Sequence, residues 1–451
     1  MNKLLLTFYG DDFTGSTDAL EQLTLAGLRT RLFIRPPTPA QLKKIPGLQA
    51  LGVAGKTRSL APQAMERELK PALRALKKLG ARHVHYKICS TFDSSPAIGS
   101  IGRVMEVAAK IFPAPFIPLL AAAPALGRYT IFGQHFARYG IGSTGAIHRL
   151  DRHPSISRHP VTPMTEADLL AHLAKQTKKR AALFDLLKLT LPPQQARVAF
   201  QQLLADKPQV VLFDALTTEH LARIGGLLEE IAGKQRTLFS VGSSGIEAAL
   251  ATHWRSMSRI PLQKNWNLPN FSTRSKQILV GSGSCSPVTS GQIAWALKHG
   301  FAEVPLNAAR LMNKTMAVRE IQRAAAEAAK LLRMNRNVII HTTRSGPDHR
   351  ITAKYKGRTA EVLGSALGKV LRRAIELHPV RRVCLAGGDT SSYAARALGI
   401  EALEMIAPLT PGAPLCRVFA PGSPADGSEV VFKGGQVGAK NYFETALRGK
   451  L

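Results

Sequence analysis

The feature that most constrains the fold is a recurring order of a short apolar strand, a polar turn and a helix. The apolar segments end at residues 9, 88, 213, 241, 280, 341 and 386, and Gly, Ser, Thr, Cys or Asp residues follow each of them. Strands that alternate with helices build parallel sheets with helices on both faces. The sequence therefore predicts an α/β chain, in which ligands bind where the strands end.

One stretch interrupts this order, between residues 256 and 276. It contains Pro261 and Pro269, several Asn and Ser, and no periodic apolar pattern, which is typical of a linker. A chain of 451 residues can also bury more than one core. We therefore expect two domains, 1–255 and 277–451, each a largely parallel sheet flanked by helices.

The charge of the chain is unusual, because 61 Lys and Arg face only 30 Asp and Glu, a formal net charge of +31. Such a charge attracts polyanions, and nucleic acid is one candidate. The basic residues are scattered, however, and aromatic residues make up only 6% of the chain, so basic and aromatic residues do not interleave. We expect no nucleic-acid partner, and keep a non-catalytic nucleotide- or nucleic-acid-binding protein as an alternative.

The cysteines and the apolar segments indicate in which compartment of the cell the protein works. Cys89, Cys285, Cys384 and Cys416 form no CxxC pair, which favours reduced thiols over a zinc or redox motif. The apolar residues 4–8 are too few for a signal peptide. Residues 111–126 hold four prolines and are too few to span a bilayer, so they predict a strand and loop. We expect a cytoplasmic protein with no membrane partner.

Two adjacent carboxylates, Asp11 and Asp12, follow the first apolar strand and precede the first predicted helix. A carboxylate at a strand end can accept the proton of a ligand hydroxyl. Asp12 is the first choice for this catalytic role and Asp11 the second. The alternative is structural, because Asp is also favoured at the start of a helix.

Further polar residues follow other strands of the N-terminal half. Arg58 could bind a substrate carboxylate with two nitrogens, and Lys87 could supply a point charge. Ser90 and Thr91 could bind hydroxyls, although helix capping and surface charge explain all four residues equally well from pattern alone. His159 begins a segment made rigid by two prolines, but a lone histidine is more often structural.

Gly/Ser-rich turns in the C-terminal half suit a phosphate, since glycine lets backbone amides approach an anion. Ser284 and Ser286 lie in one such turn, for which a plain tight turn is the alternative. The strongest is the turn at 387–390, in which Asp389 could hold Mg²⁺ through water. Two glycines in turns nearer the end of the chain, Gly412 and Gly435, are weaker indications of a nucleotide site when each is taken alone.

Two common nucleotide motifs are missing from the sequence. There is no GxxxxGK[ST] P-loop, and the GxGxxG fingerprint of dinucleotide-binding folds is also absent. The Gly-rich turns alone leave an oxidoreductase as a further alternative, which an NADH titration would decide.

Taken in order, these motifs resemble those of the four-carbon acid sugar kinase family over nearly the whole chain. The matching segments are residues 11–18, 56–59, 89–94, 159–164, 283–286 and 387–390. The chain departs from the family at Tyr9-Gly10, where many members have an apolar residue and Ala, and at Leu415, where many have an aromatic residue.

The resemblance implies an ATP-dependent kinase that phosphorylates the terminal hydroxyl of a small acid sugar and uses Mg²⁺. Its N-terminal domain would bind the sugar, through Arg58, Lys87, Ser90, Thr91 and His159. Its C-terminal domain would bind ATP, through Ser284, Ser286, Gly387, Gly388, Asp389, Thr390 and Gly435, and Gly412 is added to the nucleotide site from the local pattern alone. The segment from His159 to Met164 is most similar to the 3-oxo-tetronate branch. Threonate, erythronate or a branched acid such as 3-oxo-isoapionate are alternatives, a homodimer is allowed for, and metal ligands stay unassigned.

Overall fold

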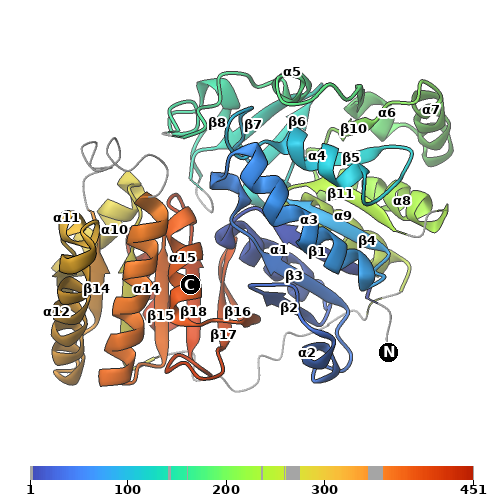
Figure 1. The fold of residues 1–451 in the computed structure, drawn as a ribbon. Coiled ribbons are helices and arrows are strands. Elements are labelled where there is room, and N and C mark those ends of the chain that lie inside the picture. The colour runs from blue at the N-terminus through green and yellow to red at the C-terminus, as the bar shows by residue number, and fades with distance from the viewer. Residues whose placement is uncertain are drawn as a thin grey trace. The chain divides into compact units, whose positions relative to one another are not determined.

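The computed structural model describes residues 4–140, 144–159, 161–234, 237–258, 260, 275–343 and 359–449, without the side chains of Lys234 and Asp389 (Figure 1). The chain divides into two compact units. Unit 1 comprises Met1–Arg31 and Arg35–Asn265, and unit 2 comprises Leu32–Ile34 and Trp266–Leu451. Most of the predicted linker, residues 259 and 261–274, lies outside the described residues. The domain boundaries expected from the sequence therefore stay a prediction.

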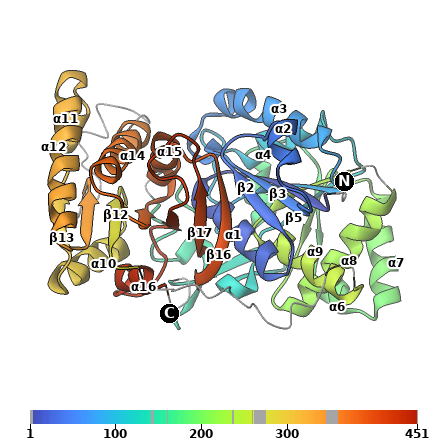
Figure 2. The same ribbon diagram turned by 90° about the horizontal axis from the view of Figure 1, so that it is seen from below.

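The main sheet of unit 1 has the strand order β3-β1-β4-β11-β5-β10-β9, and all of its pairings are parallel. Its strands are β1 (Leu6–Gly10), β3 (Ala50–Ala54), β4 (His83–Lys87), β5 (Ile117–Leu120), β9 (Ala181–Phe184), β10 (Val210–Phe213) and β11 (Leu238–Gly242). Helices α1 (Phe13–Leu25), α8 (Thr218–Lys234) and α9 (Gly245–Ser256) lie on one face, and α3 (Pro62–Lys78) and α4 (Ile101–Ala109) on the other (Figure 2).

Unit 1 also carries a small antiparallel sheet in the order β6-β7-β8. Its strands are β6 (Arg128–Ile131), β7 (Gln134–Arg138) and β8 (Ile147–Arg149). Strand β2 (Thr30–Phe33) is divided, with its last two residues counted in unit 2. The remaining elements of unit 1 are α2 (Pro39–Lys43), α5 (Leu169–Ala174), α6 (Leu186–Thr190), α7 (Pro193–Ala205), and the 3₁₀ turns Thr57–Ser59, Pro124–Leu126 and Leu150–Arg152. The expected strand and loop within 111–126 are confirmed as β5 and the second of these turns.

The sheet of unit 2 has the order β13-β14-β12-β15-β18-β17-β16, parallel up to β18 and antiparallel beyond it. The strands are β12 (Ile278–Ser282), β13 (Ala302–Pro305), β14 (Val338–His341), β15 (Arg382–Ala386), β16 (Ala402–Thr410), β17 (Ala413–Phe419) and β18 (Glu429–Lys433). The helices are α10 (Pro287–Lys298), α11 (Ala308–Leu311), α12 (Lys314–Arg333), α14 (Thr359–Leu377), α15 (Gly388–Leu398) and α16 (Tyr442–Arg448). Helices α12, α14 and α15 cover one face, and α10 and α16 the other (Figure 2).

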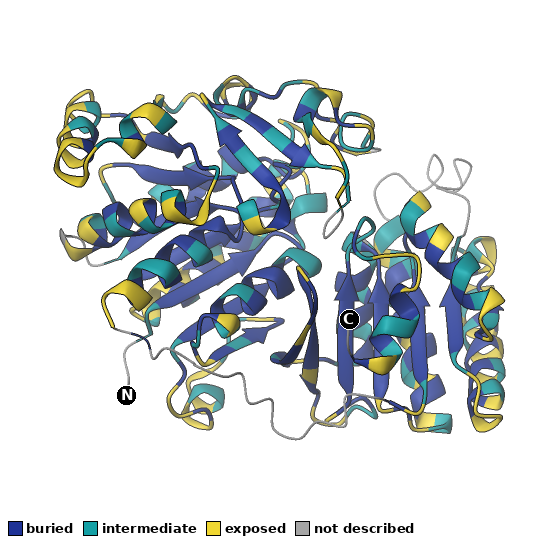
Figure 3. Cartoon of the chain, turned by 180° about the vertical axis from the view of Figure 1, so that it is seen from behind, coloured by how far each residue is buried: buried dark blue, intermediate teal, exposed yellow. Residues whose placement is uncertain are grey.

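The α/β fold expected from the sequence is confirmed in both units. Every residue of β1, β4, β12, β15 and β18 is buried, because helices cover both faces of a parallel sheet (Figure 3). Polar residues therefore gather where these buried strands end. Among the described residues, no helix is long and apolar enough to cross a membrane.

Candidate functional site

The register of the unit 1 sheet places three polar segments at one edge. Gly10, the last residue of β1, pairs with Ala54 of β3 on one side and with Lys87 of β4 on the other. The chain after β1 begins with Asp11 and Asp12, and the chain after β3 leads to Arg58. Strand ends in neighbouring register therefore bring together residues that are more than 40 positions apart in the sequence.

Arg58 binds both of the predicted catalytic carboxylates. Its Nε and Nη2 donate to Oδ2 and Oδ1 of Asp11 at 3.1 and 2.7 Å, and its Nη1 donates to Oδ2 of Asp12 at 2.6 Å. The backbone N–H of Arg58 also donates to the carbonyl of Asp11, at 3.1 Å. The guanidinium that the sequence assigns to a substrate carboxylate is thus turned toward two carboxylates of its own chain.

Asp12 is the N-cap of α1, as the structural alternative anticipated. Its Oδ1 accepts the backbone N–H of Gly15 at 2.7 Å, and its Oδ2 accepts the hydroxyl of Thr14 at 2.8 Å. Together with Arg58, these contacts occupy both oxygens of Asp12. Asp11 has no such capping role, and its two oxygens face Arg58.

The electrostatics distinguish the two carboxylates further. Burial raises the pKa of Asp11 to about 6, even though the positive charge of Arg58 acts to lower it. Burial would lower the pKa of Arg58, but the facing charges of Asp11 and Asp12 hold it well above its usual value. A carboxyl group with a pKa near 6 can both take up and release a proton close to neutral pH.

Lys87 completes this cluster from the end of β4. Its ammonium pairs with Asp18 at 3.2 Å and donates to the carbonyl of Ile88 at 3.0 Å. Burial opposes the charge, but the carboxylates of Asp18 and Asp11 outweigh it and raise the pKa of Lys87. These two contacts account for two of its three protons, which leaves one N–H for a ligand oxygen.

Gly15 lies next to the charged groups of this cluster. A Cβ atom at this position would lie 2.6 Å from Oδ1 of Asp12, 3.3 Å from Nζ of Lys87 and 3.5 Å from Nη2 of Arg58. Three charged groups from β4, α1 and the turn after β3 therefore surround a position that only glycine leaves open. We refer to Asp11, Asp12, Arg58 and Lys87 as the carboxylate cluster.

The turn after β4 lies close to this cluster and is strained. Phe92 is fully buried with φ = 58°, a conformation that residues other than glycine rarely adopt. The hydroxyl of Thr91 donates to Asp93 at 2.8 Å, while the carbonyl of Ser90 accepts from His135 at 2.8 Å. Such strain is frequent at functional sites, so the turn fits a ligand-binding role.

His159 lies within electrostatic reach of the same turn. Burial opposes ionisation of Asp93, but the charges of Arg58 and His159 help to hold the pKa of Asp93 below its usual range. Nδ1 of His159 accepts the backbone N–H of Thr162 at 3.1 Å. The neighbouring Pro160 lies outside the described residues. Sequence reasoning did not assign a role to Asp93, although it lies in a recognised segment.

In unit 2 the predicted phosphate turns also meet at the ends of neighbouring strands. A Cβ atom on Gly387, where φ is 130°, would lie 2.4 Å from Oγ1 of Thr390 and 3.3 Å from the backbone nitrogen of Ser284. One on Gly283 would lie 2.6 Å from the same Thr390 oxygen. The turns at 283–286 and 387–390 are therefore in backbone contact, and glycine is required on both sides.

The turn after β18 joins them. A Cβ atom on Gly435 would lie 3.0 Å from Cβ and 3.6 Å from Oγ of Ser286, and 3.3 Å from Oγ of Ser284. Ser286 is the N-cap of α10, and its hydroxyl accepts the N–H of Val288 at 3.2 Å. We refer to the turns 283–286, 387–390 and 434–436 as the glycine cradle.

The sequence also assigns Gly388, Asp389 and Gly412 to the nucleotide site. Gly388 is the first residue of α15, whose N-cap is Gly387. Gly412 lies in the two-residue turn between β16 and β17, where φ = 80° accounts for glycine. The side chain of Asp389 lies outside the described part of the structure, so its predicted link to Mg²⁺ stays a prediction. Among the described residues, no group of three His, Cys, Asp or Glu side chains could hold a metal ion.

The sequence assigned no role to Lys433, the last residue of β18, although it precedes the glycines of a candidate turn. It is fully buried, and its ammonium donates to Thr289 Oγ1 and to the carbonyl of Gly434, both at 2.9 Å. A lysine that ends a buried apolar strand directly before two glycines was the available signal.

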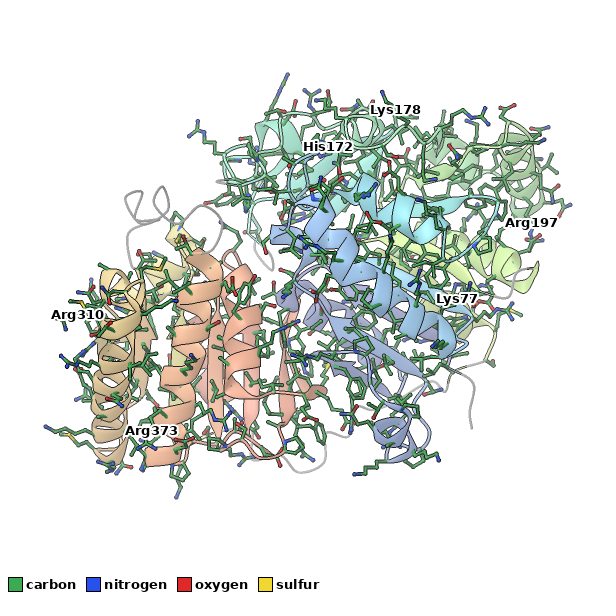
Figure 4. The ribbon with its side chains drawn as sticks, viewed as in Figure 1. Lys77, His172, Lys178, Arg197, Arg310 and Arg373 are labelled. Atoms are coloured by element: carbon green, nitrogen blue, oxygen red, sulfur yellow. The ribbon has the colours of Figure 1, made fainter. Side chains whose placement is uncertain are left out.

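The large positive charge is dispersed over both units. Arg197 of α7, Arg310 of α11 and Arg373 of α14 project outward from separate elements (Figure 4). Each of these three pairs with a glutamate, Glu230, Glu320 and Glu376 respectively. The absence of a nucleic-acid partner stays a prediction.

Comparison with known proteins identifies both halves of the chain. Residues 6–250 match the sugar-binding N-terminal domain family, and residues 279–443 match the nucleotide-binding C-terminal domain family. A 3-oxo-isoapionate kinase from Paraburkholderia graminis is 42% identical over 99% of this chain and 95% of its own. 3-Oxo-tetronate kinases from Pseudomonas savastanoi and Burkholderia multivorans are 27% and 29% identical, each over 98% of this chain and 97% of their own.

Solved structures show the same fold. A protein from Salmonella typhimurium LT2, which carries the provisional description of a tRNA synthase, has a TM-score of 0.75 at 25% identity over 99% of both chains. A Haemophilus influenzae protein has a TM-score of 0.66 at 20% identity over 98% of both chains. The sequence matches and these folds agree with the order of motifs along the chain. The chain therefore belongs to the four-carbon acid sugar kinase family.

Proposed function

We propose that the chain transfers the γ-phosphoryl group of ATP to the terminal hydroxyl of a 3-oxo sugar acid. The observation that carries this proposal is the 42% identity, over 99% of the chain, with a 3-oxo-isoapionate kinase. The 3-oxo-tetronate kinases are only 26–29% identical. A branched acid such as 3-oxo-isoapionate is therefore the first candidate substrate, ahead of the 3-oxo-tetronate that the motifs alone suggested.

Asp11 is the group that accepts the proton of the substrate hydroxyl. Its pKa of about 6 leaves it ionised at neutral pH but basic enough to take up a proton. The hydroxyl oxygen then forms a bond to the γ-phosphorus, and the bond between that phosphorus and the bridging oxygen of ADP breaks. Asp12 supports this step by capping α1 and by fixing Arg58, which in turn holds Asp11.

The substrate is held by the remaining residues around the carboxylate cluster. Lys87 directs its third proton toward a substrate oxygen, and Ser90 and Thr91 provide hydroxyls for those of the sugar. Arg58 adds positive charge that favours an anionic ligand, and His159 offers an imidazole for a polar contact. Arg58 donates its guanidinium hydrogen bonds to Asp11 and Asp12. In this assignment it therefore attracts the substrate through its positive charge and positions Asp11.

The glycine cradle fits the phosphates of ATP. Gly283, Gly387 and Gly435 leave backbone where a side chain would collide, and α10 and α15 both begin at the cradle with their positive ends. Mg²⁺ would neutralise charge on the β- and γ-phosphates. We assign Mg²⁺ to the phosphates themselves, with Asp389 as a water-mediated partner.

We also propose a cytoplasmic location, in keeping with four free cysteines. A homodimer is a further proposal, which a measurement of the mass in solution would test.

A screen of ATP consumption tests the proposal. The purified chain is mixed with ATP, Mg²⁺ and each of 3-oxo-isoapionate, 3-oxo-tetronate, threonate and erythronate, and the product is identified by mass spectrometry. We expect turnover with a 3-oxo acid and a product heavier by one phosphoryl group. ATP binding without turnover on any of these acids would instead support the non-catalytic alternative, and NADH binding would support an oxidoreductase.

A further inference from the structure

Lys433 presents a physical problem that the proposed chemistry leaves unexplained. Its side chain is fully buried, and no carboxylate of the described residues forms an ion pair with it. Its ammonium instead donates to three neutral oxygens: Thr289 Oγ1 at 2.9 Å, the carbonyl of Gly434 at 2.9 Å and the carbonyl of Gly435 at 3.4 Å. A buried charge without a counter-charge costs stability, so a residue of this kind calls for another reason to be there.

The contacts of Lys433 fix the orientation of two consecutive peptide groups. In a trans peptide the C=O of one residue and the N–H of the next point in opposite directions. Because the carbonyls of Gly434 and Gly435 point at Lys433, the N–H groups of Gly435 and Gln436 point away from it. Within the described part of the chain, neither of these two N–H groups donates a hydrogen bond.

The same turn is tied to the start of α10. Thr289, in the first turn of this helix, donates to the carbonyl of Gly435 at 3.1 Å while it accepts from Lys433. Gly435 also lies against Ser284 and Ser286 of the neighbouring turn. Two N–H groups that donate to no described residue, beside a helix N-terminus, are donors that phosphate oxygens can accept.

We propose that Lys433 is a positioning residue of the nucleotide site, which holds the 434–436 turn so that the N–H groups of Gly435 and Gln436 face a phosphate of ATP. This inference rests on the proposed function, because it takes the glycine cradle to be the ATP site. Lys433 does not touch the nucleotide in this arrangement; it acts through the backbone that it orients.

Lys433→Met separates this role from a merely structural one. Methionine has a similar length and no charge, and the two carbonyls keep partners in Val437 N–H and the Thr289 hydroxyl. Because an unpaired buried charge is removed, the melting temperature should stay the same or rise. The Kd for ATP should nevertheless increase roughly tenfold to a hundredfold, as expected when a charged hydrogen-bond donor no longer orders the site. The KM for the sugar acid should not change.

The experiment is an ATP titration by calorimetry, with steady-state kinetics, on the whole chain. Lys440→Met, at an exposed lysine of the same connection, is the matched control and should bind ATP like wild type. Thr289→Val removes one acceptor of Lys433 and one donor to Gly435, and should weaken ATP binding in the same direction. Unchanged ATP affinity in folded Lys433→Met and Thr289→Val would overturn the inference and leave the kinase proposal standing. Failure of the wild-type chain to bind ATP would overturn both.

Discussion

Arg58 and Asp11 form a two-pronged ion pair, in which Nη2 and Nε of the arginine face the two carboxylate oxygens at 2.7 and 3.1 Å. This geometry fixes the plane of the Asp11 carboxylate as well as its charge. The third nitrogen of Arg58 reaches Asp12, which caps α1. The orientation of the proposed proton acceptor is therefore tied, through one arginine, to the start of a helix.

The two aspartates should respond differently to removal of their charge. Asp11→Asn removes the proton acceptor, and turnover should fall about 10²–10⁴-fold with the Kd for ATP unchanged. Asp12→Asn keeps an oxygen for the N–H of Gly15, since Asn is also a good N-cap, and should cost less. Steady-state kinetics of both variants, with a separate ATP titration, makes the comparison. An inactive Asp12→Asn beside a nearly normal Asp11→Asn would restore the order expected from the sequence.

Arg58→Lys should move the pH dependence of the reaction. In the wild-type chain Asp11 must be ionised, so kcat should be lost as the pH falls through about 6. Arg58 lowers the pKa of Asp11, and a lysine cannot reproduce its contact through two nitrogens with the two carboxylate oxygens. The acid limb of the kcat profile should therefore shift to higher pH, and kcat at neutral pH should fall. Identical acid limbs in the two proteins would remove Asp11 from the role of base.

A pair of glycine substitutions tests the glycine cradle. Gly387→Ala would place a methyl group 2.4 Å from Thr390 in a backbone conformation with φ = 130°, so the turn must move and ATP affinity should drop roughly 100-fold. Gly291 of α10 has open space around its Cβ position. Gly291→Ala should keep normal ATP binding and gain about 0.5–1 kcal/mol of stability. Circular dichroism shows whether Gly387→Ala remains folded, and tight ATP binding by that folded variant would contradict the assignment.

The sequence was sufficient for the fold and for the location of the carboxylate cluster, for one physical reason. Buried parallel strands are continuous apolar segments, and the polar residues that follow them must lie at one edge of the sheet. The sequence alone therefore places Asp11, Arg58 and Lys87 in one site. The antiparallel strands β6, β7 and β8 were missed, because all three are short, β6 and β7 alternate buried with partly exposed residues, and no residue of β8 is buried.

What the sequence could not supply is the choice of partner for each side chain. Arg58 could have faced a ligand, but the structure turns it onto Asp11 and Asp12, because the turn after β3 brings its backbone against Asp11. Lys433 was overlooked for a related reason. Its position after an apolar strand was visible, yet only the packing of α10 over β18 shows that its charge is buried against Thr289. Pairings of this kind depend on tertiary contacts between distant segments.

The burial of Lys433 should also appear in the pH dependence of stability. Burial lowers the pKa of Lys433 to about 7 in the folded chain, against 10.5 for an exposed lysine, with Cys384 and the ring of Tyr442 as its titratable neighbours. Between these values the unfolded chain binds more protons, so the contribution of Lys433 makes the free energy of unfolding rise with pH from about 7 to about 10. Lys433→Met removes that contribution. The variant should therefore exceed wild type in stability by the largest margin below pH 7, by a few kcal/mol at most, and the margin should shrink as the pH rises.

Urea unfolding of wild type, Lys433→Met and Lys440→Met at pH 6, 7.5 and 9 measures this margin, and the free energy of unfolding of Lys440→Met should follow that of wild type at a constant difference. A margin for Lys433→Met that is constant over this range would mean that Lys433 keeps an ordinary lysine pKa in the folded chain.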